Sequence, residues 1–149
     1  MPAVTRTDLG AWLVRADPRL RDLPGHVRAG NAPFTSWCVA ASYRSRLMEP
    51  GDEIWLWVSG RDPTFPRGLW GWGAVVGPAE PDEHPPGERP TWRVSIELRV
   101  CPDESVTDHE LREAGITDLE VQRMPQGSNP SWVSRDQLAR IVPLRGRSD

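Results

Sequence analysis

Tryptophan is the residue type whose number and spacing bear most directly on the chemistry of this chain. Four of the eight tryptophans form two Trp-x-Trp pairs, Trp55 with Trp57 and Trp70 with Trp72. Residues i and i+2 of a strand share a face, so a hairpin would gather all four indoles into one aromatic surface. Such a surface is either a hydrophobic core or the wall of a pocket for a flat ring, because indoles serve both purposes.

Residues suited to catalysis or phosphate binding give less support for a site. All eighteen basic residues are arginine, which removes Schiff-base chemistry and a phosphate-loop lysine because both need lysine. The Gly71-Trp-Gly73 stretch lies inside an expected strand and lacks the further glycine and the helix of a nucleotide-binding loop. Neither a G-x-S-x-G elbow nor a cysteine-nucleophile signature is found. These features favour a protein that is not an enzyme, although spacing alone does not exclude a catalytic triad drawn from distant positions.

The cysteines and histidines predict neither a disulfide nor a metal site. Cys38 and Cys101 are expected to be reduced and half-buried, since a lone bridge is unusual in a domain of this size. His26, His84 and His109 are far apart in the sequence and form no metal-ligand pair. No metal and no cofactor are expected.

Net charge argues against a protein that coats nucleic acid in general, because such binding needs a broadly basic surface. The total is -3, but residues 1–46 carry +4, residues 47–122 carry -10 and residues 123–149 carry +3. If the fold brings the two ends together, they form a basic face on an acidic body. The alternative is that charges of both signs simply keep the surface solvated.

Length and hydropathy bound the architecture. A chain of 149 residues predicts a single domain over residues 1–149. No apolar run approaches the ~20 residues that span a bilayer, and the first residues lack the apolar centre of a secretory signal. We expect no membrane partner and a cytoplasmic location.

Strands dominate the predicted elements. Residues 53–59 are apolar on both faces and predict an interior strand, while residues 91–101 alternate between apolar and polar side chains as a half-buried strand does. Residues 69–76 are expected to pair with the first of these. Gly71 and Gly73 in its interior suggest a bulge, a barrel bend or a close approach to the backbone, and they would leave a gap in one face of that strand. Two further strands are expected at residues 11–16 and 36–40.

Short helices and one long loop complete the expected elements. Thr107-x-x-Glu110 and Ser134-x-x-Gln137 are capping boxes that predict the starts of two helices, and a turn of helix is expected at residues 43–48. Residues 78–90 hold five prolines and four acids, which predicts a solvated loop. The pattern indicates an α+β fold, a small barrel or a sandwich.

The order of several motifs resembles the EVE domain of the PUA-like superfamily over about residues 11–142. The motifs are Trp12-Leu-Val-Arg-Ala-Asp-Pro18, Pro50-Gly-Asp-Glu-Ile-Trp-Leu-Trp-Val-Ser-Gly60, Gly68-Leu-Trp-Gly-Trp-Gly-Ala-Val-Val-Gly77 with Pro81-Asp82, and Gln126-Gly-Ser-Asn-Pro130 before a capped helix. The resemblance implies a small, mostly antiparallel β-barrel with short flanking helices. It also implies a reader of modified bases, which in bacteria often acts beside a restriction nuclease.

The resemblance carries a set of candidate base-binding residues onto this chain. Stacking is assigned to Trp37 and to one of Trp57 or Trp70, and the remaining wall and polar edges to neighbouring positions. The full set is Trp37, Trp57, Ser59, Gly60, Leu69, Trp70, Gly71, Gln126 and Asn129. Trp55 and Trp72 are expected in the core.

Residues 42–44 depart from the family pattern. One branch has an Asn-Tyr-Gln stretch after the early tryptophan, where this chain has Ser42-Tyr-Arg44. Arg44 is a stronger donor than glutamine and is expected either to clamp a phosphate or carbonyl oxygen or to lie exposed at the surface.

The function expected is therefore a non-catalytic module that binds a modified base, with modified cytosine in DNA as the first choice of ligand. One alternative keeps the fold and binds RNA, as other PUA-like domains do. Another is a hydrolase of modified nucleosides, as in enzymatic ASCH relatives, although not one that uses an active-site lysine. Sugar binding on the tryptophan surface is a fourth reading, disfavoured by the absence of an export signal.

Overall fold

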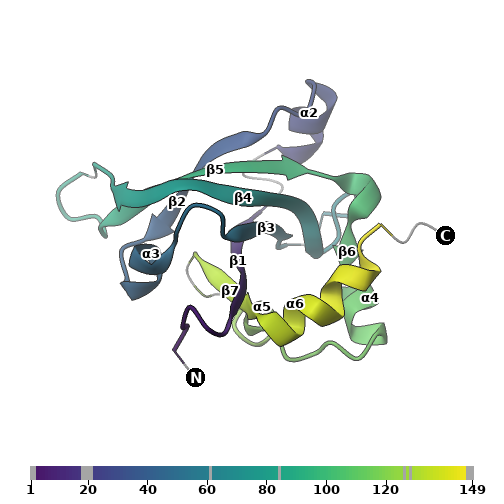
Figure 1. Ribbon diagram of the computed structural model, residues 1–149. Coiled ribbons are helices and arrows are strands. Elements are labelled where there is room, and N and C mark those ends of the chain that lie inside the picture. The colour runs from purple at the N-terminus through teal and green to yellow at the C-terminus, as the bar shows by residue number, and fades with distance from the viewer. Residues whose placement is uncertain are drawn as a thin grey trace.

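The structure is a computed structural model that describes residues 3–17, 22–60, 62–83, 85–125, 127 and 129–146. It has one mixed sheet flanked by short helices (Figure 1). The strands are β1 (Leu9–Ala16), β2 (Phe34–Ala40), β3 (Glu53–Val58), β4 (Gly68–Pro81), β5 (Thr91–Val100), β6 (Val106–Thr107) and β7 (Ser131–Ser134). The helices are α2 (Leu23–Arg28), α3 (Tyr43–Leu47), α4 (Asp108–Glu113), α5 (Glu120–Arg123) and α6 (Arg135–Ile141), with 3-10 turns η1 (Pro102–Glu104) and η2 (Val142–Leu144).

The sheet is mostly antiparallel but does not close into a barrel. Its order is β2-β5-β4-β3-β1-β7, with β6 paired to β4, and β1 and β3 are parallel neighbours. No ladder joins the end strands β2 and β7 within the described part of the chain. The expected closed barrel is therefore wrong, whereas the α+β class is confirmed. β7 is only four residues long and pairs with β1. The loop before β7, not β7 itself, contacts β2, where Ala40 N donates to Asn129 O (2.9 Å).

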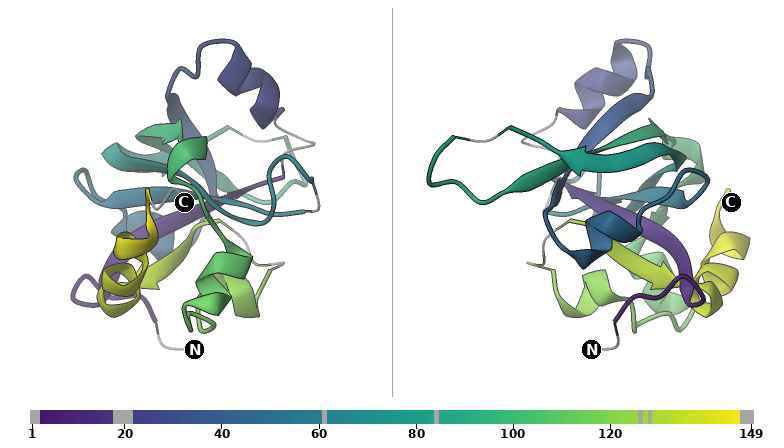
Figure 2. Two further views of the ribbon diagram at one scale, coloured as in Figure 1. Left: turned by 90° about the vertical axis from the view of Figure 1, so that its right-hand side faces the viewer. Right: turned by 60° about the vertical axis from the view of Figure 1, so that its left-hand side comes forward.

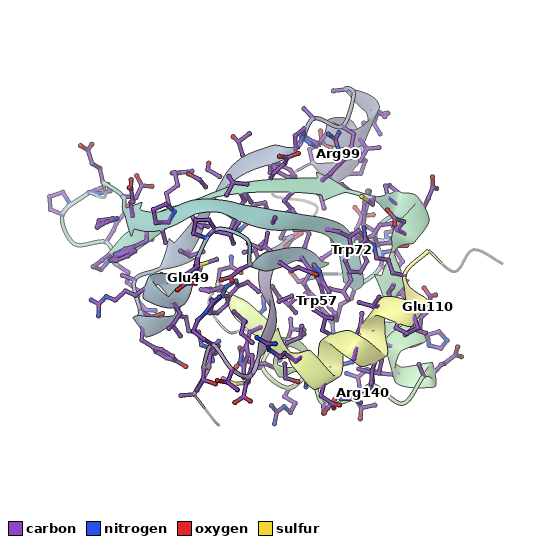
Figure 3. All side chains as sticks on the ribbon, viewed as in Figure 1. Glu49, Trp57, Trp72, Arg99, Glu110 and Arg140 are labelled. Carbon is purple, nitrogen blue, oxygen red and sulfur yellow. The ribbon has the colours of Figure 1, made fainter. Side chains whose placement is uncertain are left out.

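Two hydrophobic clusters lie on the two faces of the sheet. The first draws on five strands from β2 to β1 and includes Trp12, Trp37 and Trp70. Strands far apart in the sheet order can share one cluster only if the sheet curls around it, and Figure 2 shows this curvature. The second cluster packs the opposite face against α4, α5 and α6, and Figure 3 shows Trp57 on that side of β3.

The two Trp-x-Trp pairs do not form one aromatic surface. Trp55 and Trp72 face each other across β3 and β4, with ring centroids 5.0 Å apart. A bulge then pairs Trp57 with Leu69 and leaves Trp70 as the extra residue. Trp70 consequently packs in the first cluster against Phe65, while the other three indoles lie in the second. All four are between 1% and 8% exposed, so the expected single surface is wrong.

Gly71 and Gly73 mark close backbone contact rather than a gap. A Cβ on Gly73 would lie 2.0 Å from Glu97 O, and one on Gly71 would lie 2.9 Å from Arg99 O and from Leu56 Cβ. The expected close approach to the backbone is therefore confirmed, whereas the expected gap is wrong because the neighbouring strands fill the space. Glycine is required because no side chain fits between these backbones.

Several expectations about the elements are confirmed and one boundary is wrong. The alternation of β5, the two apolar faces of β3 and both capping boxes appear as expected. The loop expected from Pro78 begins instead after Pro81, because β4 continues along β5. β3 has ended by then, so β4 has a free edge where proline costs no ladder hydrogen bond. α2, α5, β6 and β7 were not expected.

The remaining findings concern cysteines, metals and membranes. Cys38 and Cys101 are free and half-buried, as expected. Among the described residues, no three His, Cys, Asp or Glu side chains gather as a metal site would require. None of the described helices has both the length and the apolar character needed to cross a bilayer.

Candidate functional site

A cavity of about 370 Å³ opens where β1, β2, α3 and the chain after α5 meet. We call it the Arg44 cavity, and its lining residues are Arg15, Ala40, Ser42, Tyr43, Arg44, Glu120, Met124, Gly127, Asn129 and Pro130. Figure 1 shows α3 and α5 on either side of β7, which is one of the two end strands of the sheet. The volume is at the lower end of the range for small-molecule sites.

The first turn of α3 is held by a cap, which positions the two residues that follow it. Ser42 Oγ accepts a hydrogen bond from Arg44 N (3.2 Å), and Ser42 N donates to Ser45 Oγ (3.2 Å). These bonds satisfy backbone and side-chain groups at the helix start and fix the direction of the chain there. Tyr43 and Arg44 therefore enter the cavity wall from a rigid turn.

Arg44 and Glu120 form a bidentate ion pair in the wall. Arg44 Nη1 donates to Glu120 Oε1 (2.6 Å) and Nη2 donates to Oε2 (2.8 Å). Nη1 also donates to Pro130 O (3.1 Å), and Ser131 Oγ donates to Glu120 Oε1 (2.9 Å). Two parallel bonds orient the planar guanidinium, so both charged groups present a fixed edge.

Burial and hydrogen bonding act in opposite directions on this pair. Burial alone would raise the pKa of the Glu120 carboxyl, but the bonds from Arg44 and Ser131 outweigh it and hold the pKa below its ordinary value. The bond to Glu120 outweighs the effect of burial on Arg44 and raises the pKa of its guanidinium. Both groups are therefore charged at neutral pH, and Arg44 is not the exposed surface residue that was one of the two expectations.

A second arginine holds the loop that forms the opposite wall. Arg15 Nη2 donates to Met124 O (2.8 Å), Nη1 donates to Gly127 O, and the backbone N donates to Asn129 Oδ1 (2.7 Å). Burial lowers the pKa of the Arg15 guanidinium. Its Nε is buried and has no hydrogen-bond partner among the described residues. The cavity thus has two guanidiniums and one carboxylate, which leaves it with a positive charge.

Two large apolar side chains stay exposed at this cavity. Tyr43 is 45% exposed and Met124 is 48% exposed, whereas most of the large apolar side chains that the structure describes are buried in the two clusters. Val4 N donates to the Tyr43 hydroxyl (3.1 Å) and anchors the far end of the ring. An aromatic face and a polarisable thioether both suit contact with a flat ring.

Two of the ten predicted site residues, Arg44 and Asn129, line this cavity. Gln126 lies outside the described residues. Ser59 N and Oγ both donate to Ala16 O (2.9 and 3.3 Å), which ties the end of β3 to β1, and Gly60 follows with a φ of 94°.

The other predicted residues lie in the interior. Trp57 and Leu69 are in the second cluster, Trp70 is in the first, and Gly71 is enclosed by neighbouring backbone and by Leu56. Trp37 is 1% exposed in the first cluster, although it also contributes to a separate cavity beside Arg93. The structure does not bring these residues together with Arg44 and Asn129 at one cavity.

Sequence reasoning missed Arg15, Tyr43, Glu120 and Met124 as cavity residues. Tyr43 had a signal, since it stands in the stretch where the chain departs from the family pattern. Glu120 had none, because a single glutamate in the first turn of a short helix resembles any surface acid. Its partner Arg44 is 76 positions away in the sequence, and spacing does not reveal such a pair.

Comparison with family models finds no match for the chain. Comparison with curated proteins also finds none. Solved structures do match. Rpa0253 from Rhodopseudomonas palustris aligns with a TM-score of 0.65 at 18% identity, over 95% of this chain and 96% of that one. Atu2648 from Agrobacterium tumefaciens aligns with a TM-score of 0.58 at 15% identity, over 93% and 95%.

Human THYN1 is a third similar structure, and it was solved in complex with DNA that contains 5-methylcytosine. It aligns with a TM-score of 0.63 at 14% identity, over 93% of this chain and 98% of that one. At these identities the likeness is one of fold.

Proposed function

We propose that this chain is an EVE-type, non-catalytic module that binds DNA and holds one modified cytosine base in the Arg44 cavity. Tyr43 stacks on the flat face of the base and Met124 contacts it from the loop. Arg44, Glu120 and Asn129 read the edge of the ring through hydrogen bonds. A base held in this way has left its helix, as in other proteins that read a base outside the stack.

The observation that carries the proposal is an exposed aromatic ring beside a rigid, buried ion pair. Stacking on an aromatic side chain is worth ~1–3 kcal/mol per base and does not depend on the base. Discrimination must then come from the polar edge, and the Arg44–Glu120 pair holds its donors and acceptors in one orientation. The similar fold of THYN1, solved with 5-methylcytosine DNA, supports the choice of ligand.

The two histidines that the structure describes lie outside the Arg44 cavity. His109 Nε2 lies 3.0 Å from Glu113 Oε1 on an exposed face of α4, and His26 stacks on Phe34 at 4.4 Å. Neither residue belongs to the Arg44 cavity. A general base must come within hydrogen-bond reach of the proton it takes, and these two do not stand at the proposed ligand.

The test compares DNA duplexes that are identical except for one cytosine. Binding is measured by fluorescence anisotropy with plain cytosine, 5-methylcytosine and 5-hydroxymethylcytosine at that position. We expect at least one modified duplex to bind about tenfold more tightly than the plain one, since a modest pocket contact is worth ~1–2 kcal/mol. Equal affinity for all three duplexes would show that the chain is no base reader.

An RNA arm separates the alternative ligand. A matched RNA carrying the same modified cytosine enters the same assay, in single-stranded and loop form. Tighter binding to RNA than to DNA would overturn the DNA assignment, because the 2′-hydroxyl is then being recognised.

A further inference from the structure

A second cavity of about 440 Å³ lies directly beside the first. We call it the Arg89 cavity, and its lining residues are Cys38, Val39, Ala40, Ala41, Arg89, Pro90, Thr91 and Asn129. It shares Ala40 and Asn129 with the Arg44 cavity. The hydrogen bond from Ala40 N to Asn129 O therefore lies in the wall common to both cavities.

Strand pairing builds this cavity from two distant segments. The end of β2 and the start of β5 are antiparallel neighbours, with Ala40 opposite Thr91 and Val39 opposite Trp92. Arg89 and Pro90 come just before Thr91, so they extend the wall from the β5 side. The proline-rich loop between β4 and β5 thus places Arg89 in the cavity wall.

Arg89 is exposed, and its guanidinium makes no hydrogen bond or ion pair with any residue that the structure describes. Nearby Arg93, in contrast, pairs with Asp82 (3.1 Å). A guanidinium without a protein partner keeps all its donors for a ligand, and its planar fork matches the geometry of a phosphate. Glu88 adjoins it in sequence, so loss of Arg89 would leave a net negative charge at that point of the loop.

We propose that the Arg89 cavity holds the nucleotide that adjoins the captured base, with Arg89 donating to its phosphate. This inference rests on the proposed function, because it concerns the strand whose base occupies the Arg44 cavity. A strand that delivers a base past Ala40 and Asn129 has its next nucleotide on the other side of the same wall. The Arg89 cavity provides space and an arginine at that place.

The experiment pairs Arg89→Gln with Arg28→Gln as the control. Arg28 is an exposed arginine of α2 and has no hydrogen bond or ion pair with the described residues, and Figure 1 shows α2 well away from the loop between β4 and β5. The probe is a duplex with one 5-methylcytosine, alongside its unmodified counterpart. We expect R89Q to weaken binding to both duplexes about tenfold, since a phosphate contact does not read the base, and to reduce the salt slope by about one. R28Q should leave affinity unchanged.

A second measurement locates the phosphate. Methylphosphonate replaces, in turn, the linkage on the 5′ side and on the 3′ side of the methylcytosine, and each probe is bound by the unchanged protein and by R89Q. At one linkage the two changes should not add, because each removes the same contact. Additive losses at both linkages, or an R89Q affinity equal to that of R28Q, would overturn the inference.

The outcomes keep the two proposals apart. If the unchanged protein binds methylated and plain duplexes equally while R89Q still weakens both, the proposed function fails and the Arg89 cavity stands as a phosphate site. If the protein discriminates but R89Q matches R28Q, the proposed function stands and the Arg89 inference fails. Thermal melting of both variants should match the unchanged protein, since neither side chain packs in a core cluster.

Discussion

Arg44 and Glu120 form an ion pair whose loss would leave one buried charge without its partner. The carboxylate side chain is only 8% exposed and accepts bonds from Arg44 and from Ser131. A buried pair adds little net stability against an apolar replacement, but breaking it is costly. In the proposed site the pair serves to orient its own hydrogen-bond donors and acceptors, because two parallel bonds hold the guanidinium and the carboxylate together.

Replacing Glu120 with glutamine should reduce stability in a pH-dependent way. The pKa of Glu120 is lowered in the folded state, so its contribution is present above the unfolded value near 4.5 and is lost as pH falls through the lower folded value. We expect E120Q to unfold about 2–3 kcal/mol more easily at pH 7. The difference should shrink as the pH falls through the lowered pKa of the native carboxyl, because that carboxyl then becomes protonated as well.

Urea denaturation of both proteins across that pH range measures this. Glu113→Gln is the control, since Glu113 pairs with His109 at an exposed position where ion pairs contribute little. A stability difference for E120Q that stays constant from neutral to acid pH would contradict the assignment of a charged Glu120.

Tyr43 is the aromatic residue that the proposed function needs. Tyr43 is 45% exposed and belongs to neither hydrophobic cluster, so Tyr43→Ala should alter the fold little. Removal of the stacking face should weaken binding of the modified duplex tenfold to a hundredfold. Tyr43→Phe should retain most of the affinity because it keeps the ring. Anisotropy titrations compare the variants, and an unchanged affinity in Y43A would remove Tyr43 from the site.

At the scale of elements, β4 decides how the sheet curls and where the tryptophans point. Its bulge opposite Leu56 and Trp57 moves Trp70 to the face away from Trp57. Gly73 lets β5 approach so closely that no Cβ fits beside Glu97 O. The tryptophans of β4 therefore serve to pack the core, and the proposed site lies at the ends of other strands.

Substitution of Gly73 by alanine should therefore destabilise the protein strongly. The added Cβ would meet backbone atoms, which cannot turn aside as a side chain can, and overpacking of this kind costs about 3 kcal/mol or more. Gly77→Ala is the matched control in the same strand, because its Cβ would meet only the side chain of Ser95 at 3.1 Å. Thermal melting should show a fall of roughly 6–12 °C for G73A. Equal melting of the two variants would contradict the close approach.

At the scale of the whole molecule, three arginines near the chain ends are paired with acids and do not contribute to a free basic face. Arg6 pairs with Asp52, Arg140 with Asp118 and Arg145 with Glu104. Acids of the negative middle segment thus neutralise arginines of the positive ends. The two cavities keep their own guanidiniums, so the proposed DNA contact is local rather than spread over the surface.

A local contact predicts a modest salt dependence of DNA binding. With about two to four phosphates neutralised, log K should fall with log salt at a slope of about -2 to -4. Titrations of the methylated duplex between 50 and 200 mM potassium chloride give this slope. A value steeper than about -6 would indicate a broad basic surface, which the paired arginines do not provide.

The sequence predicted most of the strands and both capping boxes because their signals are local. Alternation in β5, apolar faces in β3 and the boxes at Thr107 and Ser134 each depend on a few adjacent residues. The pattern of strands and short helices also predicted the α+β class, which the structure confirms. α2 and β7 were missed because six and four residues carry little periodic signal.

Chemistry that needs particular residue types was settled by the sequence alone, since a chain without lysine forms no lysine Schiff base in any fold. The burial of the tryptophans and the placing of the cavity were decided only by tertiary structure. One bulge separated Trp70 from the other paired indoles, and β3 and β5 approached the glycines of β4 too closely for any pocket there. The pair of Arg44 with Glu120 joins residues 76 positions apart. Such contacts depend on how strands and loops pack in three dimensions, and no short stretch of sequence reveals that packing.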